Sequence, residues 1–254
     1  MLEIDFNLFD HNFCEATIYS SGQHPEYMNA FSSLFITFIG LNGMRKINND
    51  NILLSTYACL AVNGILSSYY HYYNSIGYGL LDRMSMILLA LNTTYMFISN
   101  MKNIFQFSKF INIMINIIVI TYYSFMLTTA GLHIEWLFNT LFSLFLVSIC
   151  IYIIVIRKYA NHMCINSNIL TIGTRGTLYI ICSAIFWGST ELLCNKFNFI
   201  KYLYGHVWWH IFVSYGGYLI SLVPYYINMM YKHGLNKEIL IYYDIFNIPY
   251  IKCL

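Results

Sequence analysis

Apolar residues fill most of this chain in long runs, and short polar breaks separate the runs. A helix that crosses a bilayer needs about 20 mostly apolar residues. No internal repeat is visible, and no linker indicates a second domain. The pattern predicts an all-α membrane protein, a bundle of seven transmembrane helices. We expect these helices at residues 28–47, 51–72, 78–99, 108–128, 134–156, 172–192 and 206–230.

The composition supports this interpretation. Of the 254 residues, 58% are hydrophobic and only 9% are charged, whereas a soluble domain carries roughly 25% charged residues. The net charge of +2 is small and dispersed, which argues against nucleic-acid binding. We therefore expect the lipid bilayer as the main partner of the surface, and we predict no nucleic-acid partner and no protein partner.

The distribution of Lys and Arg predicts the orientation in the membrane. Seven spans place the two ends of the chain on opposite sides. The side of the N-terminal tail carries only Lys196 and Lys201, whereas the other side carries ten basic residues. These are Arg45, Lys46, Lys102, Lys109, Arg157, Lys158, Arg175, Lys232, Lys237 and Lys252. Because basic loops face the cytosol, we expect a cytosolic C-terminus and a lumenal or extracellular N-terminus, in the endoplasmic reticulum, the Golgi or the plasma membrane.

Five polar residues fall at one membrane face in this topology. His206 and His210 open the last span at positions i and i+4, so both imidazoles lie on one face of a helix. Ser67 and His71 end the second span with the same spacing, and Asp82 begins the third. Even-numbered spans end, and odd-numbered spans start, on the N-terminal side. Polar groups are costly within a bilayer, so their agreement in depth indicates a functional site near the lumenal face.

The residue types indicate a zinc site. Catalytic zinc takes three protein ligands and keeps one open position, and His71, His206 and His210 supply three imidazoles. Such a zinc ion lowers the pKa of water and polarises a carbonyl group. Asp82 is placed to accept the proton of the water and return it to the leaving group. Ser67 is placed to hydrogen-bond the water or the oxyanion.

Alternatives remain for some of these residues. A serine at this position commonly bonds a helix carbonyl instead, and Ser68 competes with Ser67 for the role. We interpret Trp208 and Trp209 as part of an interfacial aromatic belt. We interpret the other five histidines as solvated or interfacial: they are His11, His24, His133, His162 and His233. The metal-assisted reaction predicted by the site is hydrolysis of an amide or ester held in the bilayer.

The combination of motifs resembles the alkaline ceramidases, within the wider superfamily of seven-span hydrolases that includes the adiponectin receptors. The matching segments are Ser67-x3-His71-x10-Asp82, His206-x3-His210 with its internal Trp-Trp pair, Asn12-Phe13-Cys14-Glu15, Glu26, and the run of Trp187, Glu191 and Cys194. The resemblance covers nearly the whole chain. The Trp-Trp pair and the N-terminal Cys-Glu favour a ceramidase over a receptor, as does the lumenal N-terminus.

The resemblance implies a zinc-dependent amidase that hydrolyses the N-acyl bond of ceramide to a sphingoid base and a fatty acid. It implies zinc at His71, His206 and His210, with catalytic roles for Ser67 and Asp82. It also implies a disulfide between Cys14 and Cys194, the two cysteines that we expect in segments exposed to an oxidising lumen. Finally, it implies calcium bound by oxygen atoms, from Asn12, the Phe13 carbonyl, Glu15, Thr17 and Glu26. The expected organisation is an acidic lumenal tail over 1–27, a hydrolase domain over 28–230 and a cytosolic tail over 231–254.

The chain departs from the family pattern at three positions. Asn12 replaces an Asp and Thr17 replaces an Asn, so the calcium site loses one charge and we expect weaker calcium binding; the alternative is a tail that is acidic but binds no calcium. Arg83 replaces an acidic residue, and a cation there either keeps Asp82 ionised or ties it up in a salt bridge. Two alternative functions therefore stay open, a receptor like the adiponectin receptors and a catalytically inactive protein stapled by zinc.

Overall fold

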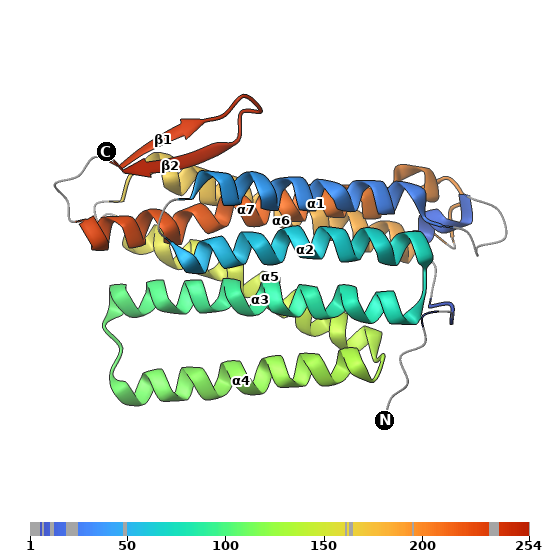
Figure 1. Ribbon diagram of the computed structural model, residues 1–254, viewed down its shortest axis with the longest axis horizontal. Coiled ribbons are helices and arrows are strands. Elements are labelled where there is room, and N and C mark those ends of the chain that lie inside the picture. Colours follow the sequence, from blue (N-terminus) through green and yellow to red (C-terminus); the bar gives the residue numbers. More distant parts are fainter. Residues whose placement is uncertain are drawn as a thin grey trace.

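The computed structural model describes residues 6, 8–10, 13–18, 25–47, 50–160, 162, 165–194, 196–233 and 239–253. Within these residues the fold is a bundle of seven α helices that lie along a common axis (Figure 1). They are α1 (Tyr27–Lys46), α2 (Asn51–Tyr73), α3 (Ile76–Phe105), α4 (Lys109–Gly131), α5 (Glu135–Tyr159), α6 (Ser167–Leu193) and α7 (Gly205–His233). Each helix covers all or nearly all of one predicted span. Four of them, α2, α4, α5 and α6, are long and apolar enough to cross a membrane.

A tight turn between α2 and α3 fixes one end of the bundle. Asn74 adopts a left-handed conformation and ends α2, and the hydroxyl of Ser75 accepts the Tyr78 N–H at the start of α3. Such a capping side chain satisfies an N–H group that the first turn leaves unpaired. The turn brings His71 and Asp82 to the same end of neighbouring helices, as the predicted topology requires.

The helices differ in how closely they pack. Helix α7 packs along α6 and also against α1. Gly176 of α6 and Gly216 of α7 face each other so closely that a Cβ on either would come within 3 Å of the other's carbonyl oxygen. Small residues permit this approach between helix backbones in a membrane. Helix α4, in contrast, lies at the margin of the bundle (Figure 1) and exposes most of its side chains.

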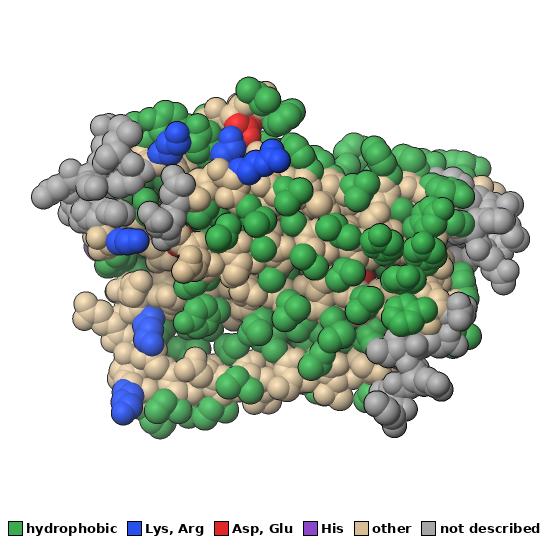
Figure 2. Space-filling view, viewed as in Figure 1, with side chains coloured by type: hydrophobic (Ala, Val, Ile, Leu, Met, Phe, Trp, Pro, Cys, Tyr) green, Lys and Arg blue, Asp and Glu red, His purple; other side chains and the backbone are tan. Residues whose placement is uncertain are grey.

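A β-hairpin follows α7 and was not predicted from the sequence. Strands β1 (Ile239–Tyr243) and β2 (Pro249–Cys253) pair in antiparallel register, with Tyr243 opposite Pro249. The segment predicted as a cytosolic tail, 231–254, therefore contains the end of α7 and a folded hairpin. The hairpin lies beside α1, at the end of the bundle where Lys and Arg gather on the face shown in Figure 2.

Two short 3₁₀ helices lie at the opposite end. They are η1 (Cys14–Ile18) and η2 (Ile200–Leu203). A disulfide joins Cys14 to Cys194, the pairing that the resemblance implied. The backbone N–H of Cys14 also donates to the carboxylate of Glu191 in the last turn of α6. Together these contacts fasten the N-terminal segment to the end of α6, next to the start of α7.

Candidate metal centre

Three histidines from two helices form a buried cluster. His71 of α2 and His206 and His210 of α7 are each at most 5% exposed. One ligand nitrogen from each can be chosen so that all three lie within 4.8 Å of one another. The structure thus brings together the three residues that helical spacing and topology had predicted as metal ligands.

A carboxylate orients the first histidine. The Nδ1 of His71 lies 2.6 Å from Glu26 Oε2, just before the start of α1. Glu26 is held in turn by the Asn29 side chain and by the Phe13 N–H. With its proton on Nδ1, His71 donates to Glu26 and directs the lone pair of Nε2 toward the cluster. A carboxylate behind a histidine is the usual outer partner of a metal-binding imidazole.

Two serines determine the tautomer of His210. The hydroxyls of Ser32 and Ser33 both donate to the carbonyl of Asn29, at 3.0 and 2.9 Å. Each hydroxyl has a single proton, so its oxygen accepts in its second contact. That contact is with His210 Nδ1, at 2.8 Å from Ser32 and 3.3 Å from Ser33. His210 Nδ1 therefore carries the proton, and Nε2 keeps the lone pair that a metal requires.

The predicted catalytic residues lie on the same cavity. Asp82 is buried at the start of α3, and its Oδ1 accepts from Asn63 Nδ2 at 3.2 Å. The Asn63 amide also donates to Ser85 at 2.8 Å. The Ser67 hydroxyl lies 3.1 Å from Ser33, so the network behind His210 reaches it as well. Asn63, Ser67, His71 and Asp82 all line one cavity with the other two histidines.

Sequence reasoning missed the residues behind the ligands. Ser32 and Ser33 form an adjacent pair in an apolar span, and Asn63 lies one turn before Ser67 on the face that carries His71. That helical spacing was the available signal for Asn63. The partners of Ser32, Ser33 and Glu26 depend on how α1 packs against α2 and α7, which the sequence pattern does not reveal.

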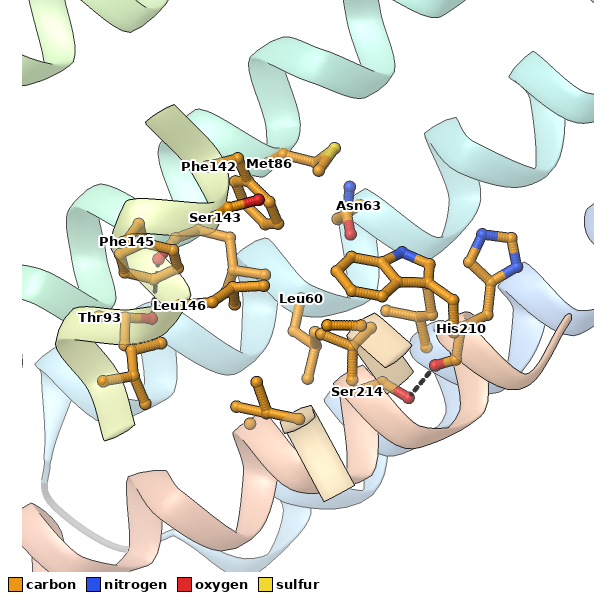
Figure 3. A pocket seen from close by; sticks show the side chains of 18 of the residues that line it. Leu60, Asn63, Met86, Thr93, Phe142, Ser143, Phe145, Leu146, His210 and Ser214 are labelled. Carbon is orange, nitrogen blue, oxygen red and sulfur yellow. Dashed lines mark hydrogen bonds between the residues drawn. The ribbon is translucent and has the colours of Figure 1, made fainter. Parts of the chain in front are cut away.

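The cavity is large and mostly apolar. Its volume is about 640 Å³, within the roughly 300–1,000 Å³ of small-molecule sites. Figure 3 shows His210 and Asn63 at one end, and Phe145 and Leu146 of α5 toward the other. Ile151 and Ile154 also line the cavity and are exposed on the outer face of α5. The cavity therefore reaches the side of the bundle.

Aromatic rings cover the histidines. The ring of Phe13 lies 4.0 Å from the His206 ring and 5.2 Å from the His71 ring, measured between centroids. Trp187 packs against His206 and against Trp209. Trp209 is buried at 7% exposure and Trp208 is 41% exposed. The interpretation of both tryptophans as an interfacial belt is therefore wrong for Trp209, because it faces the cavity and packs in the core.

Two of the residues proposed for calcium have other contacts. Glu15 Oε1 accepts the backbone N–H of His206 at 2.8 Å and so caps the start of α7. Burial raises the pKa of Glu15, and the His206 N–H only partly offsets this. Burial also acts to raise the pKa of Glu26, but its contacts with His71, the Asn29 side chain and the Phe13 N–H outweigh burial, and the pKa lies below its ordinary value. Asn12 and the side chain of Thr17 lie outside the described residues, so the calcium site stays a prediction.

Arg83 contacts residues other than Asp82. Its guanidinium lies 3.6 Å from Asp10 and 3.3 Å from Glu135, and it donates to His133 Nδ1 at 3.1 Å. No ion pair between Arg83 and Asp82 occurs among the described residues. The guanidinium instead connects the N-terminal segment, α3 and the start of α5 at the edge of the cavity.

Comparison with known proteins identifies one relationship. A family model described as Ceramidase matches residues 10–252. The match covers nearly the whole chain, including the three histidines, Asp82 and all but the last residue of the β-hairpin. No curated protein matches the chain.

Proposed function

The chain belongs to the ceramidase family, and on that premise we propose that it is a zinc-dependent membrane amidase that hydrolyses ceramide. The products are a sphingoid base and a fatty acid. Family membership supports a hydrolase that acts on amides in lipids. The observation that carries the finer proposal is the buried cluster of His71, His206 and His210 on the wall of a mostly apolar cavity.

The chemistry of the donor set favours zinc. Three neutral imidazoles suit zinc, and three protein ligands leave a position open in a tetrahedral site. The contacts of His71 with Glu26 and of His210 with Ser32 support this, because they hold a proton on Nδ1 and leave Nε2 free. When bound, zinc acts as a Lewis acid and lowers the pKa of water toward about 7.

We assign the proton transfers to Asp82. It takes a proton from the attacking water and gives it to the nitrogen of the departing sphingoid base, as a general base and then a general acid. Asn63 orients the Asp82 carboxylate through its hydrogen bond. Ser67 lines the cavity, and its hydroxyl donates its proton to Ser33 Oγ; during the reaction this proton turns to the oxyanion that develops at the amide carbonyl. The apolar remainder of the cavity holds a lipid chain and excludes water.

We further propose that all seven helices span the membrane, with the metal centre near the lumenal face. The hydrolase domain is then 28–230, between a lumenal segment over 1–27 and a cytosolic segment over 231–254. The compartment is the endoplasmic reticulum, the Golgi or the plasma membrane. The side of the bundle beside α5, which the cavity reaches, faces lipid in this arrangement. The proposed calcium site rests on the family resemblance alone. Its residues are Asn12, Phe13, Glu15, Thr17 and Glu26.

The test is hydrolysis of ceramide with a labelled acyl chain by the purified protein, together with metal analysis. We expect one zinc per chain and release of labelled fatty acid. Asp82→Asn should retain zinc and lose activity by roughly 10²–10⁴-fold, the contribution of a general base. His206→Ala should lose both zinc and activity. His162→Ala, an exposed histidine far from the cluster in sequence, is the matched control and should lose neither.

Each other result has a definite meaning. Zinc at full occupancy with no hydrolysis of any ceramide would favour the inactive, zinc-stapled alternative. Absence of zinc from active protein would contradict the assignment of the metal. Calcium in the same metal analysis tests the N-terminal site independently of the reaction.

A further inference from the structure

The turn of the β-hairpin exposes large apolar side chains. Ile245 is 93% exposed and Phe246 is 60% exposed, and Tyr243 beside them is 54% exposed. A folded protein rarely presents adjacent side chains of this size to water without a partner. We therefore expect another surface to cover the exposed side chains of this turn.

The hairpin is attached along one face of α1. Phe38, Asn42 and Lys46 are spaced i, i+4 and i+8 on this helix, so they share a face. Lys46 lies 3.6 Å from the Asp244 carboxylate, and Asn42 donates to it at 3.1 Å. The ring of Phe246 packs edge-on against Phe38, 5.4 Å away. The turn thus points back along α1, away from the basic end of the bundle (Figures 1 and 2).

This geometry gives the depth of the turn. Eight residues separate Phe38 from Lys46, which is about 12 Å along a helix at 1.5 Å per residue. Lys46 is one of the basic residues that we place at the cytosolic surface. Its ammonium lies over the ring of Tyr250, and Lys252 lies over Tyr242 and Tyr250. Tyrosines and lysines of this kind are typical of the membrane–water interface, whereas the turn extends beyond them toward the apolar part of the bundle.

Four of the five backbone N–H groups from Asp244 to Ile248 have hydrogen-bond partners within the turn. Asp244 Oδ1 accepts the N–H groups of Phe246 and Ile248, each at 2.9 Å. The N–H of Asn247 donates to the Asp244 carbonyl, and the N–H of Asp244 donates to the Ile248 carbonyl. An unsatisfied N–H group costs free energy in hydrocarbon, and these four are satisfied inside the turn.

We propose that the turn of the hairpin inserts into the cytosolic leaflet of the membrane, with Ile245 and Phe246 in contact with lipid chains. The occupant of this surface is lipid rather than a protein, because Phe246 continues the exposed apolar surface of α1 at Phe38. The depth is comparable to that of apolar groups that lie in the interfacial region. The inference rests on the proposed membrane topology, in which α1 is a span, and it does not depend on the proposed reaction.

The test is a spin label at Ile245→Cys in protein reconstituted as one copy per lipid nanodisc. The background replaces the five cysteines outside the Cys14–Cys194 disulfide by Ala. Collisions with oxygen, which partitions into lipid, are compared with collisions with a water-soluble nickel complex. We expect the label at residue 245 to favour oxygen. Lys158→Cys, on an exposed residue that we place in the cytosol, is the aqueous control and should favour nickel.

A second label at Leu34→Cys, on an exposed residue of α1, tests the membrane topology separately from the insertion of the turn. Leu34 in lipid with residue 245 in water would overturn the inference and leave the topology standing. Leu34 in water would overturn both. A label at residue 245 that loses contact with water only when two copies share a disc would identify a second copy as the occupant and overturn the lipid assignment. Ceramide hydrolysis by the same samples reports separately on the reaction.

Discussion

Asn63 is the side chain that holds the Asp82 carboxylate in place within a buried, mostly apolar cavity. It donates one proton to Asp82 Oδ1, and its amide also donates to Ser85. A general base must keep its geometry to within a fraction of an ångström, and a misplacement of about 1 Å can cost roughly 100-fold in rate. The orientation of Asp82 therefore depends on a residue of the neighbouring helix.

Replacement of Asn63 by Ala should lower kcat by roughly 10- to 100-fold and leave the zinc content unchanged, because the Asn63 amide hydrogen-bonds to Asp82 and Ser85 rather than to a metal ligand. The measurement is the rate of ceramide hydrolysis at saturating substrate, together with metal analysis. Asn92→Ala is the matched control: Asn92 also connects α3 to α2, through Ser55, and should retain the wild-type kcat. An Asn63 variant with unaltered kcat would remove Asn63 from the mechanism.

Replacement of Glu26 by Gln tests the outer partner of the zinc site. Gln keeps an oxygen near His71 Nδ1 but removes the negative charge that strengthens this contact. We expect the affinity for zinc to fall by roughly 10- to 100-fold, the usual effect of changing such a partner. Competition with a chelator measures it. Glu135→Gln, at a carboxylate that contacts Arg83 instead, should leave the affinity for zinc unchanged.

At the scale of helices, residue spacing and the order of the spans predicted the metal ligands but not the residues that support them. His206 and His210 repeat at i and i+4, and the order of the spans brings His71 to the same end. The roles of Ser32 and Ser33 could not be predicted, because they arise only where α1 contacts α7. Trp209 was misjudged for the same reason: its neighbour Trp187 comes from another helix. Periodicity shows which face of a helix carries the site residues, but not which other helix packs against that face.

Arg83 connects different elements of the fold. Its replacement tests whether it restrains Asp82 or mainly stabilises the fold. If the guanidinium suppressed Asp82, Arg83→Met should raise activity. Its contacts with Asp10 and Glu135 predict the opposite, because they connect three segments at the edge of the cavity. Loss of one partner from a buried ion pair commonly costs about 3–5 kcal/mol, and the exposure of Glu135 reduces this.

We therefore expect Arg83→Met to lower the free energy of unfolding by about 2–3 kcal/mol and not to raise kcat. Thermal unfolding and hydrolysis rates on the same preparation measure both. Arg157→Met is the control, since Arg157 is exposed and donates to Thr174, and it should change stability little. A gain in kcat for Arg83→Met would show that the cation does restrain Asp82.

At the scale of the molecule, the sequence predicted seven helices, and the structure has seven in its described residues. Only α2, α4, α5 and α6 are apolar enough to be identified as spans by hydropathy. In the other three helices, Asn, Ser, Gly and Tyr recur between the apolar residues and lower the mean hydropathy. The hairpin went unpredicted because a strand pair of five residues each is too short to stand out in an apolar sequence.

Two independent features bear on how the whole molecule is oriented. Ten basic residues fall on the side that we place in the cytosol, and only Lys196 and Lys201 fall on the other. Cys194 lies between the end of α6 and the start of α7, whereas the hairpin follows the other end of α7, and a disulfide persists in an oxidising compartment but not in the cytosol. The basic residues act while the chain inserts into the membrane, and the disulfide forms afterwards. The two features therefore indicate the orientation independently, and they agree.

In sealed microsomes with an epitope at each end of the chain, added protease should therefore remove the C-terminal epitope and leave the N-terminal one intact. With detergent both should be digested, which controls for access. In the same vesicles, Cys14 and Cys194 should react with a thiol-alkylating reagent only after a reductant is added. Digestion of the N-terminal epitope in intact vesicles would reverse the orientation, place the zinc centre near the cytosol and require the disulfide to survive where thiols are kept reduced.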